Sequence, residues 1–265
     1  MSASQERNTI FIMIHSYKGG TGKTSIAVNL AHYFSEKENK NVLLIEQDIG
    51  GPTLNDIFYV NPVHYWSEFY NSNLQLKEMI TKTDYFDIIC ANSDEITIPE
   101  VIETQSYFIR QLERFKYEKR YLNQIYDIVI FDTHPGYNVS LINCIAISDV
   151  VLLVSRRDSD VIDSTIDLYN KVYSHFQSKK MLIIENQVPE PIASYKIEKV
   201  DRKYLNSIEK WKTFLSDKKV ITIPLKNEIA YTLSLSKIIP FNNPLSSYIE
   251  KISEIITNFS SETNF

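Results

Sequence analysis

The glycines of this chain are confined to three short segments. Only six glycines occur in 265 residues, at positions 19, 20, 22, 50, 51 and 136. Each segment begins shortly after the end of an apolar run. Glycine is needed where the backbone takes a positive φ or approaches another group closely. We therefore expect three special loops, each placed by the strand before it, rather than ordinary turns.

Short apolar runs alternate with longer helix-like stretches along the chain. The runs are rich in Val, Ile and Leu with little polar alternation, which is typical of parallel strands buried on both faces. They are Ile10–His15, Asn41–Glu46, Phe86–Ala91, Asp127–Phe131, Val150–Ser155, Met181–Glu185 and Val220–Ile223. The helix-like stretches are Lys23–Glu36, Glu100–Asn123, Tyr137–Ile147, Ser159–Phe176, Asp201–Leu215, Lys226–Ser236 and Pro244–Phe259. This order predicts an α/β protein with a doubly wound, mostly parallel β-sheet and helices on both faces.

The domain organisation follows from the same pattern. No repeat, low-complexity tract or linker divides the sequence, so we expect a single domain over residues 1–265. Residues 1–8 are predicted to form a polar N-terminal tail and residues 260–265 a frayed C-terminal tail. The less regular stretch Asn61–Thr83 predicts a pair of short surface helices with mostly buried aromatic side chains. In a parallel sheet, ligands bind at the carboxyl ends of the strands, where all three glycine segments fall.

Composition excludes several classes of protein. The chain is 43% hydrophobic and 23% charged with a net charge of −5, which argues against a protein that coats nucleic acid with its whole surface. Cys90 and Cys144 stand in apolar runs without a Cys-x-x-Cys partner, so we expect reduced core thiols rather than a metal site. No signal-peptide pattern and no apolar run of about 18 residues occurs. We therefore expect a cytoplasmic protein without stable membrane insertion, associated with the nucleoid if it binds DNA.

The first glycine segment has the context of a phosphate-binding loop. Lys18-Gly-Gly-Thr-Gly-Lys23-Thr24 stands between a predicted strand and a predicted helix. Backbone N–H groups of such a loop, together with the positive helix end, hold phosphate oxygens. We expect Lys23 to neutralise the β- and γ-phosphates and the Thr24 hydroxyl to hold Mg²⁺. The nucleotide-binding residues predicted here are Gly19, Gly20, Thr21, Gly22, Lys23, Thr24 and Ser25.

This loop departs from the general P-loop pattern in an informative way. Tyr17 replaces the first glycine of G-x-x-x-x-G-K-[ST], and Lys18 follows it. Lys-Gly-Gly-x-Gly-Lys-Thr resembles the deviant Walker A box of the ParA/MinD family of ATPases, and the resemblance covers about residues 9–258. It implies a P-loop fold, ATP or ADP with Mg²⁺ as cofactors, and an ATP-dependent homodimer in which Lys18 reaches the partner's ATP. Such a cation can act as an arginine finger does.

Two acidic loops follow the next strands of the predicted site. The family pattern Asp-x-Asp implies that Asp48 positions the attacking water and contributes to the Mg²⁺ site. Glu46 replaces the first Asp, so we expect either a Mg²⁺-linked carboxylate or a salt-bridged strand end. Asp132 ends an apolar strand as a Walker B residue does and is expected to bind the Mg²⁺ shell through water or Thr24. Gly136 is expected to turn its N–H toward the γ-phosphate, and His134 to be a solvent-facing loop residue.

The resemblance extends to the nucleotide base and the end of the chain. It implies that Asn186 hydrogen-bonds the adenine edge, because an amide supplies one donor and one acceptor. The loop that contains Pro224 resembles the family's Ile-Pro loop, whose backbone lines the base. The closing stretch Tyr248–Phe259 has an acidic or neutral polar face. This face favours docking against the sheet over binding to anionic lipid, unlike MinD-type members.

Our leading hypothesis is a ParA-like ATPase that acts in plasmid or chromosome partition. It would dimerise on ATP, bind DNA without sequence preference, and hydrolyse ATP slowly to ADP and phosphate until a ParB-like or other partner protein stimulates it. DNA contacts of this kind are made by lysine and arginine to phosphates. The candidate positions are Arg110, Arg114, Lys116, Lys119, Arg120, Arg156, Arg157, Lys196, Lys199, Arg202 and Lys203.

Two alternatives stay open at this point. The first is a nucleotide-switch module of MinD/ParA type that positions a protein cargo without binding DNA, since acidic residues interleave with the basic ones. The second is a metabolic, ATP-using synthetase built on the same scaffold. The partner protein and the cargo are not encoded in any motif of the chain.

Overall fold

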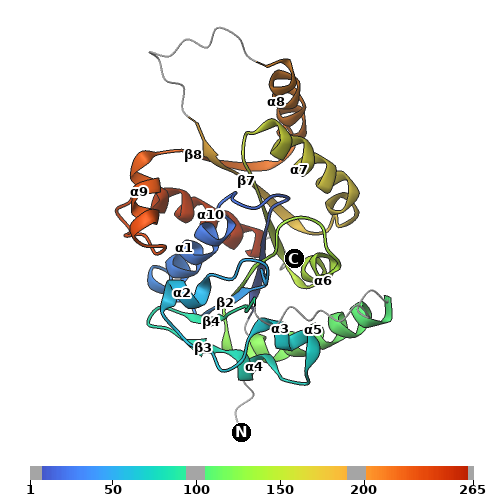
Figure 1. Cartoon of the computed structure of the whole chain (residues 1–265), viewed down its shortest axis with the longest axis vertical. Helices are drawn as coiled ribbons and strands as arrows, with labels where there is room; N and C mark the ends of the chain where they lie inside the picture. Colours follow the sequence, from blue (N-terminus) through green and yellow to red (C-terminus); the bar gives the residue numbers. More distant parts are fainter. Residues whose placement is uncertain (1–7, 94–104, 190–200, 262–265) are drawn as a thin grey trace.

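The computed structural model describes residues 8–93, 105–189 and 201–261. One eight-stranded sheet runs through them in the order β3-β4-β2-β5-β1-β6-β7-β8 (Figure 1). All neighbouring strands pair in parallel except β3 and β4. The strands are β1 (Ile10–His15), β2 (Val42–Glu46), β3 (Thr81–Lys82), β4 (Asp87–Ile89), β5 (Ile128–Asp132), β6 (Val150–Ser155), β7 (Lys180–Val188) and β8 (Lys219–Pro224). This confirms the predicted doubly wound, mostly parallel sheet.

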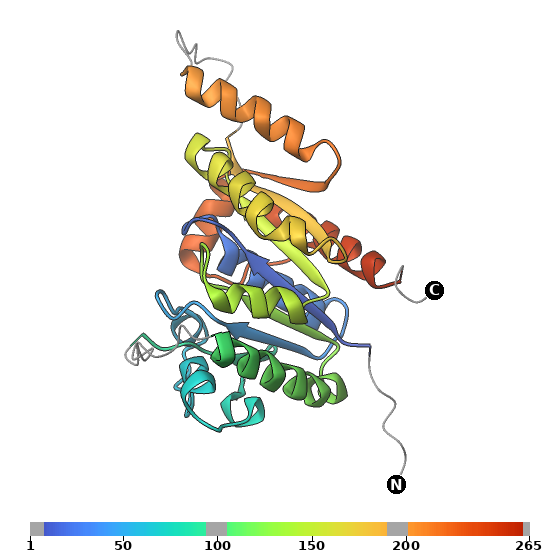
Figure 2. The same ribbon diagram turned by 90° about the vertical axis from the view of Figure 1, so that its right-hand side faces the viewer.

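Helices cover both faces of the sheet. One face carries α1 (Lys23–Glu36), α2 (Leu54–Phe58), α9 (Asn227–Leu235) and α10 (Pro244–Ser261) (Figure 1). The other carries α3 (Trp66–Asn71), α4 (Leu76–Met79), α5 (Gln105–Ile125), α6 (Val139–Ile147), α7 (Ser159–Lys171) and α8 (Arg202–Leu215), as the turned view also shows (Figure 2). A 3-10 turn, η2 (Tyr173–His175), follows α7.

Burial on two faces explains the uninterrupted apolar strands. In β1, Ile12 and Ile14 pack into the core cluster under α1 and α10. Phe11 and Met13 point to the opposite cluster, under α5 and α6. Each side chain of such a strand is removed from water, so neither face tolerates unpaired polar residues. The strand that feeds the phosphate loop is therefore held from both sides.

The predicted elements are found with several differences. Strand β7 continues past its predicted end at Glu185 to Val188, so Asn186 lies inside the strand rather than after it. The strand β3 and the short helix α2 were not predicted, because two residues and five residues carry little periodic pattern. The helix predicted for Ser159–Phe176 ends at Lys171 and is followed by η2. The start predicted at Glu100 for the helix α5 lies outside the described residues. Helix α10 continues to Ser261, so the frayed tail expected from residue 260 was placed too early.

The closing helix α10 docks inside the protein rather than presenting an apolar face. Ile249, Ile252 and Ile256 are at most 1% exposed and join the core cluster beneath α1. This confirms the docking that the acidic polar face predicts. Within the described ranges, no helix combines the length and the apolarity needed to cross a bilayer.

The aromatic stretch near residue 65 is buried, as its sequence predicts. Trp66 and Phe69 are at most 1% exposed and stack with ring centroids 5.0 Å apart. Both rings also contact Phe115 of α5. The Arg114 guanidinium lies over the Phe69 ring and donates to backbone carbonyls of Phe69, Ser72 and Leu74. Arg114 therefore fixes α3 and its following loop against α5.

A buried carboxylate joins β7 to three other elements. The Glu185 side chain is 2% exposed and accepts two hydrogen bonds from Arg157, at 2.7 and 2.9 Å. Trp211 Nε1 donates to it at 2.7 Å and the Thr222 hydroxyl at 2.6 Å. Burial raises the pKa of Glu185, but these hydrogen bonds outweigh burial and hold the pKa below its ordinary value. The carboxylate is therefore ionised at neutral pH and fully satisfied.

We predict that Glu185→Ala lowers the free energy of unfolding by about 2–4 kcal/mol, because the Arg157 charge and the Trp211 N–H lose their partner. This loss is smaller than that expected for a fully buried ion pair, because the Arg157 side chain is 38% exposed and its charge can be hydrated in the variant. Chemical denaturation measures the effect. Glu209→Ala, on the exposed surface of α8, is the control and should change stability by less than about 0.5 kcal/mol. An equally small loss for Glu185→Ala would contradict this account.

Candidate nucleotide-binding site

The three glycine segments meet at the carboxyl edge of the sheet. Strand β5 lies between β1 and β2, and Asp132 is in register with Ile14 on one side and Glu46 on the other. The loops that leave these three strands are therefore neighbours. Parallel strands bring their carboxyl ends to one edge, which is the usual ligand position in this architecture. The fold thus brings Lys23, Asp48 and Asp132 together, as the sequence predicts.

The phosphate loop has the backbone that glycine alone accepts readily. Gly20 has φ +72° and Gly22, the N-cap of α1, has φ +91°. A Cβ on Gly22 would lie 2.3 Å from Asn186 Nδ2, so this position also lacks space. No side chain caps the N-terminus of α1, and its first turn holds no acidic residue. Its N–H groups therefore face the loop, which is the arrangement that binds anions.

Lys23 and Asp132 form the charged centre of the site. Lys23 is 6% exposed, and burial lowers the pKa of its ammonium, with Asp132 and Asp48 opposing that shift. Asp132 is 1% exposed, and within the described residues neither of its oxygens has a hydrogen-bond partner of good geometry. Burial raises the pKa of Asp132 to about 6, while the neighbouring Thr24 hydroxyl and the Lys23 ammonium lower it in part.

An unsatisfied, buried carboxylate beside a threonine hydroxyl fits a hydrated divalent cation. Mg²⁺ prefers oxygen ligands and keeps several waters, so one carboxylate and one hydroxyl suffice on the protein side. A cation would also remove the desolvation penalty that raises the pKa of Asp132. Thr24 and Asp132 are placed for this role. Among the described residues no cluster of three or more His, Cys, Asp or Glu side chains offers an all-protein metal site.

Asp48 lies at the rim of this centre, next to a histidine. Its Oδ1 is 3.8 Å from His134 Nε2, and the His134 side chain is 43% exposed. The His134 Nδ1 lies 2.6 Å from the Pro135 carbonyl oxygen. The sequence predicts a solvent-facing histidine, and the side chain is indeed partly exposed. Its contact with Asp48 was not predicted, because it depends on how the loops after β2 and β5 meet.

Lys18 is exposed, and the carboxylate that it influences is a different one from those near Lys23. The carboxylate of Asp160, at the start of α7, has a lowered pKa, chiefly through its hydrogen bond and ion pair with Lys203 and further through Lys18. Gly19 and Gly20 are exposed as well. The first lysine of the motif is thus presented at the surface of the phosphate loop, whereas the second is buried within it.

Glu46 has neither of the roles that we considered for it. Its Oε1 accepts hydrogen bonds from the backbone N–H groups of Thr53 and Leu54, at 2.6 and 3.2 Å, and from the Thr53 hydroxyl. Its Oε2 accepts from the Ala91 N–H at 3.0 Å. Burial raises its pKa to about 7, against the effect of the amides of Ala91 and Thr53. The Glu46 carboxylate therefore fixes the start of α2 and the segment after β4, and its oxygens are occupied by these hydrogen bonds.

The Gly136 turn is closed in this structure. The sequence predicts that its N–H turns toward a γ-phosphate, but it donates to the Ser16 carbonyl at 2.9 Å. The Gly136 carbonyl lies 2.9 Å from His15 Nε2. His15 was missed as a candidate, although a histidine that ends an otherwise apolar strand directly before the phosphate loop was a usable signal. Any contact of the Gly136 N–H with phosphate requires the bond to Ser16 to break.

A pocket lies beside the phosphate loop where the base is expected. It is lined by Gly22, Ser25, Ile26, Asn186, Gln187, Ile223, Pro224, Leu225, Lys226, Ile229, Ala230, Leu233 and Leu245. Asn186 Nδ2 donates to the Thr21 carbonyl at 2.7 Å, so one amide proton is used to hold the phosphate loop. The other amide proton and the oxygen are the groups that a base could meet. The sequence predicts Asn186 and Pro224 in this place, and both line the pocket.

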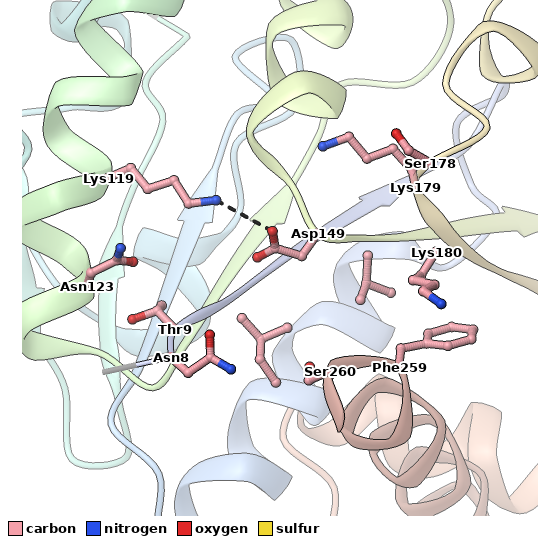
Figure 3. Close-up of a pocket in the computed structure, with 12 residues that line it drawn as sticks. Asn8, Thr9, Lys119, Asn123, Asp149, Ser178, Lys179, Lys180, Phe259 and Ser260 are labelled. Carbon is pink, nitrogen blue, oxygen red and sulfur yellow. Dashed lines mark ion pairs between the residues drawn. The ribbon is translucent and has the colours of Figure 1, made fainter. Parts of the chain in front are cut away.

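A second pocket lies at the opposite edge, where the strands begin (Figure 3). Lys119 lies 3.5 Å from Asp149 and donates to the Ile147 carbonyl, and Lys179 donates to the carbonyls of Ala146 and Ser148. Lysines near a helix C-terminus stabilise its unsatisfied carbonyls in this way. The lysines of this pocket therefore stabilise the C-terminal end of α6, and the pocket is separate from the nucleotide site.

Five of the nine predicted DNA contacts that lie in the described residues have intramolecular partners. Arg114 and Lys119 bind backbone carbonyls, and Arg157 binds Glu185. Arg156 lies 3.0 Å from Asp158, and Lys203 lies 2.5 Å from Asp160. Lys196 and Lys199 lie outside the described residues. The four remaining candidates are exposed. Arg110, Lys116 and Arg120 lie on α5, and Arg202 lies on α8.

Comparison with known proteins agrees with this geometry. The profile of a family described as an AAA domain (AAA_31) matches residues 9–181. The chain belongs to the ParA/MinD family of ATPases. Among curated proteins, the flagellum site-determining protein YlxH of Helicobacter pylori is 25% identical over 239 residues, which span 84% of this chain and 78% of that protein.

Two solved structures of this family resemble the chain over nearly its whole length. A plasmid partition protein of Borrelia burgdorferi bound to AMPPNP has a TM-score of 0.70 at 22% identity, covering 95% of this chain and 99% of that one. The ATP complex of a variant of Cyanothece McdA has a TM-score of 0.73 at 16% identity, covering 95% of this chain and 97% of that one. At these identities the likeness establishes the fold.

We predict that Asp132→Asn removes a pH dependence from the nucleotide-free protein. The pKa of Asp132 is raised from 3.8 in the unfolded chain to about 6 in the folded protein. Protonated Asp132 therefore contributes stability that is fully present below pH 4 and is lost as the pH rises through 6. Between pH 4 and pH 8, the free energy of unfolding of wild type should fall by on the order of 3 kcal/mol through ionisation of Asp132. This contribution should be absent from Asp132→Asn. Denaturation of both proteins across this range measures the difference, and parallel pH profiles would contradict the buried charge.

Proposed function

We propose that this chain is a ParA-like ATPase of a single P-loop domain, which binds MgATP, dimerises, and hydrolyses ATP to ADP and phosphate. The observation that carries the proposal is the buried, unsatisfied Asp132 carboxylate beside Lys23 and Thr24 at the phosphate loop. The family membership supports the same reaction. A Mg²⁺ ion bound there would neutralise charge on the phosphates during transfer.

Each residue has a defined part in this reaction. Backbone N–H groups from Gly19 to Ser25 hold the phosphates, and the Lys23 ammonium neutralises them. Thr24 and Asp132 would hold the water shell of a Mg²⁺ ion. Asp48, at the rim, orients the attacking water and adds to that shell. The loop after Asp48 is close-packed at Gly50, where an added Cβ would lie 3.3 Å from His134 Nε2.

The exposure of Lys18 supports the proposed dimer. Because Lys18 is exposed whereas Lys23 is buried, Lys18 is available to a nucleotide bound in a second copy. A cation delivered across an interface stabilises charge on the transferred phosphate and links hydrolysis to association. Hydrolysis would then release the two copies. Asn186 and Pro224 would contact the base from the pocket beside α1.

We further propose that the ATP dimer binds DNA without sequence preference, near the nucleoid, and that a ParB-like or other partner accelerates slow hydrolysis. Similarity to a plasmid partition protein supports this role. Within the described residues, the exposed candidates without an ion pair are Arg110, Lys116 and Arg120 on α5 and Arg202 on α8, and the three on α5 are the proposed contacts. Three such cations can contact successive phosphates.

A protein-positioning module that does not bind DNA is the second candidate. It is favoured by the internal pairing of Arg156, Arg157 and Lys203, which removes basic surface near the nucleotide edge. Similarity to a flagellum site-determining protein also points to positioning of a cellular structure. The two candidates share the ATP switch and differ only in what the dimer holds.

Three variants separate the parts of the switch. Lys23→Ala should weaken ATP binding about 10–100-fold, because a buried charge-assisted phosphate contact is lost. Lys18→Ala should keep ATP binding and lose the ATP-dependent dimer, and Asp48→Ala should trap that dimer. Binding of a fluorescent ATP analogue and light scattering measure these effects. A Lys18→Ala protein that still dimerises on ATP would contradict the role of Lys18.

A gel shift on arbitrary duplex DNA separates the two candidate functions. The DNA-binding candidate predicts retention that requires ATP and falls by at least about tenfold between roughly 50 and 200 mM salt. Replacing Arg110, Lys116 and Arg120 by Ala should reduce retention, whereas the same loss of charge at Lys171, Lys212 and Lys251 should not. Absence of retention at low salt with ATP would favour the protein-positioning module.

A further inference from the structure

A buried histidine connects three elements at the nucleotide edge. His15 ends β1 and is 0% exposed. Its Nε2 lies 2.9 Å from the carbonyl oxygen of Gly136, in the turn after β5. Its Nδ1 lies 2.7 Å from the hydroxyl of Tyr173, in the 3-10 turn η2 that follows α7. The ring of this β1 residue therefore joins the strand before the phosphate loop to the turn after Asp132 and to the 3-10 turn that follows α7.

These partners determine where the ring carries its proton. A backbone carbonyl only accepts hydrogen bonds, so Nε2 must carry the hydrogen that points to Gly136. Nδ1 is then an acceptor, and the Tyr173 hydroxyl donates to it. Burial lowers the pKa of His15 to about 3 and raises the pKa of Tyr173 well above its ordinary value. Both side chains are neutral at physiological pH, and the tautomer is fixed by its contacts.

The Gly136 turn is held on both sides of its α-carbon. Its N–H donates to the Ser16 carbonyl at 2.9 Å, and its carbonyl accepts from His15. The φ of Gly136 is +82°, a region in which glycine has little steric restriction. Rotation about the N–Cα bond of Gly136 can therefore release the N–H from Ser16 while the carbonyl stays bound to His15.

We propose that His15 is a positioning residue for this turn. It anchors the Gly136 carbonyl while the Gly136 N–H exchanges the Ser16 oxygen for a phosphate oxygen of bound nucleotide. Tyr173 keeps the ring in the required tautomer and thereby links the turn to the end of α7. The consequence for turnover rests on the ATP hydrolysis proposed above, whereas the anchor itself exists in the nucleotide-free protein.

Two substitutions distinguish an anchor from an ordinary core histidine. The amide nitrogen of Gln extends about as far as Nε2 and can still donate to the Gly136 carbonyl. Asn is shorter and leaves that carbonyl without its donor. His32 is a matched control, because it is also buried at 7% exposure but stacks on Phe241 and meets the Tyr85 ring edge-on, and it has no contact with Gly136 among the described residues. His32→Asn tests the loss of a core histidine in general.

Hydrogen exchange of the Gly136 amide, followed by NMR in the nucleotide-free protein, tests the anchor directly. His15→Asn should exchange about five- to tenfold faster than wild type, as expected for the loss of one hydrogen bond. His15→Gln and His32→Asn should stay within about twofold, and Tyr173→Phe should lie between. Equal exchange in wild type, His15→Asn and Tyr173→Phe would overturn the proposal. If His15→Asn does not fold, the exchange rate of the Gly136 amide in Tyr173→Phe is the test, and a rate equal to that of wild type would overturn the proposal.

Steady-state turnover supplies the second readout. His15→Asn should lower kcat about five- to tenfold with ADP affinity unchanged, and His15→Gln should restore most of kcat. A loss of ADP affinity that matches the loss of kcat, with no rescue by Gln, would show a purely structural role and overturn the inference. A wild-type protein that binds ATP but does not hydrolyse it would instead refute the proposed function, and the exchange measurement would still decide on the anchor.

Discussion

Burial of the Asp132 carboxylate at the end of β5 is the constraint on which the nucleotide edge depends. A carboxylate with 1% exposure and no hydrogen-bond partner of good geometry among the described residues is costly in isolation. Its neighbour Lys23 is also buried and has a lowered pKa. The two groups therefore stabilise each other only in part, and a cation with phosphate would complete the charge balance.

The sheet makes this arrangement possible because it is covered on both faces. Helices α1 and α10 pack on one side and α5 and α6 on the other, so both faces of β1 and β5 are buried. Polar groups emerge only where these strands end. Glu46, at the end of β2, and Glu185, within β7, are two further buried carboxylates. They differ from Asp132 because backbone amides or an arginine satisfy them.

The sequence was sufficient to predict what depends on local pattern. Apolar strands, the phosphate loop, and the meeting of Lys23, Asp48 and Asp132 follow from periodicity and from the parallel order of strands. The sequence was insufficient for contacts made between distant elements. The pairing of Arg157 with Glu185, the cap that Glu46 gives to α2, and the bond from Gly136 to Ser16 depend on tertiary packing, which no local pattern encodes.

The charge balance at Asp132 can be measured most directly by calorimetric titration of ATP with and without Mg²⁺. The account predicts that Mg²⁺ strengthens ATP binding to wild type by at least about tenfold, since the cation satisfies a buried carboxylate. In Asp132→Asn this gain should be lost while binding of ATP without Mg²⁺ persists. An equal gain from Mg²⁺ in both proteins would contradict the account.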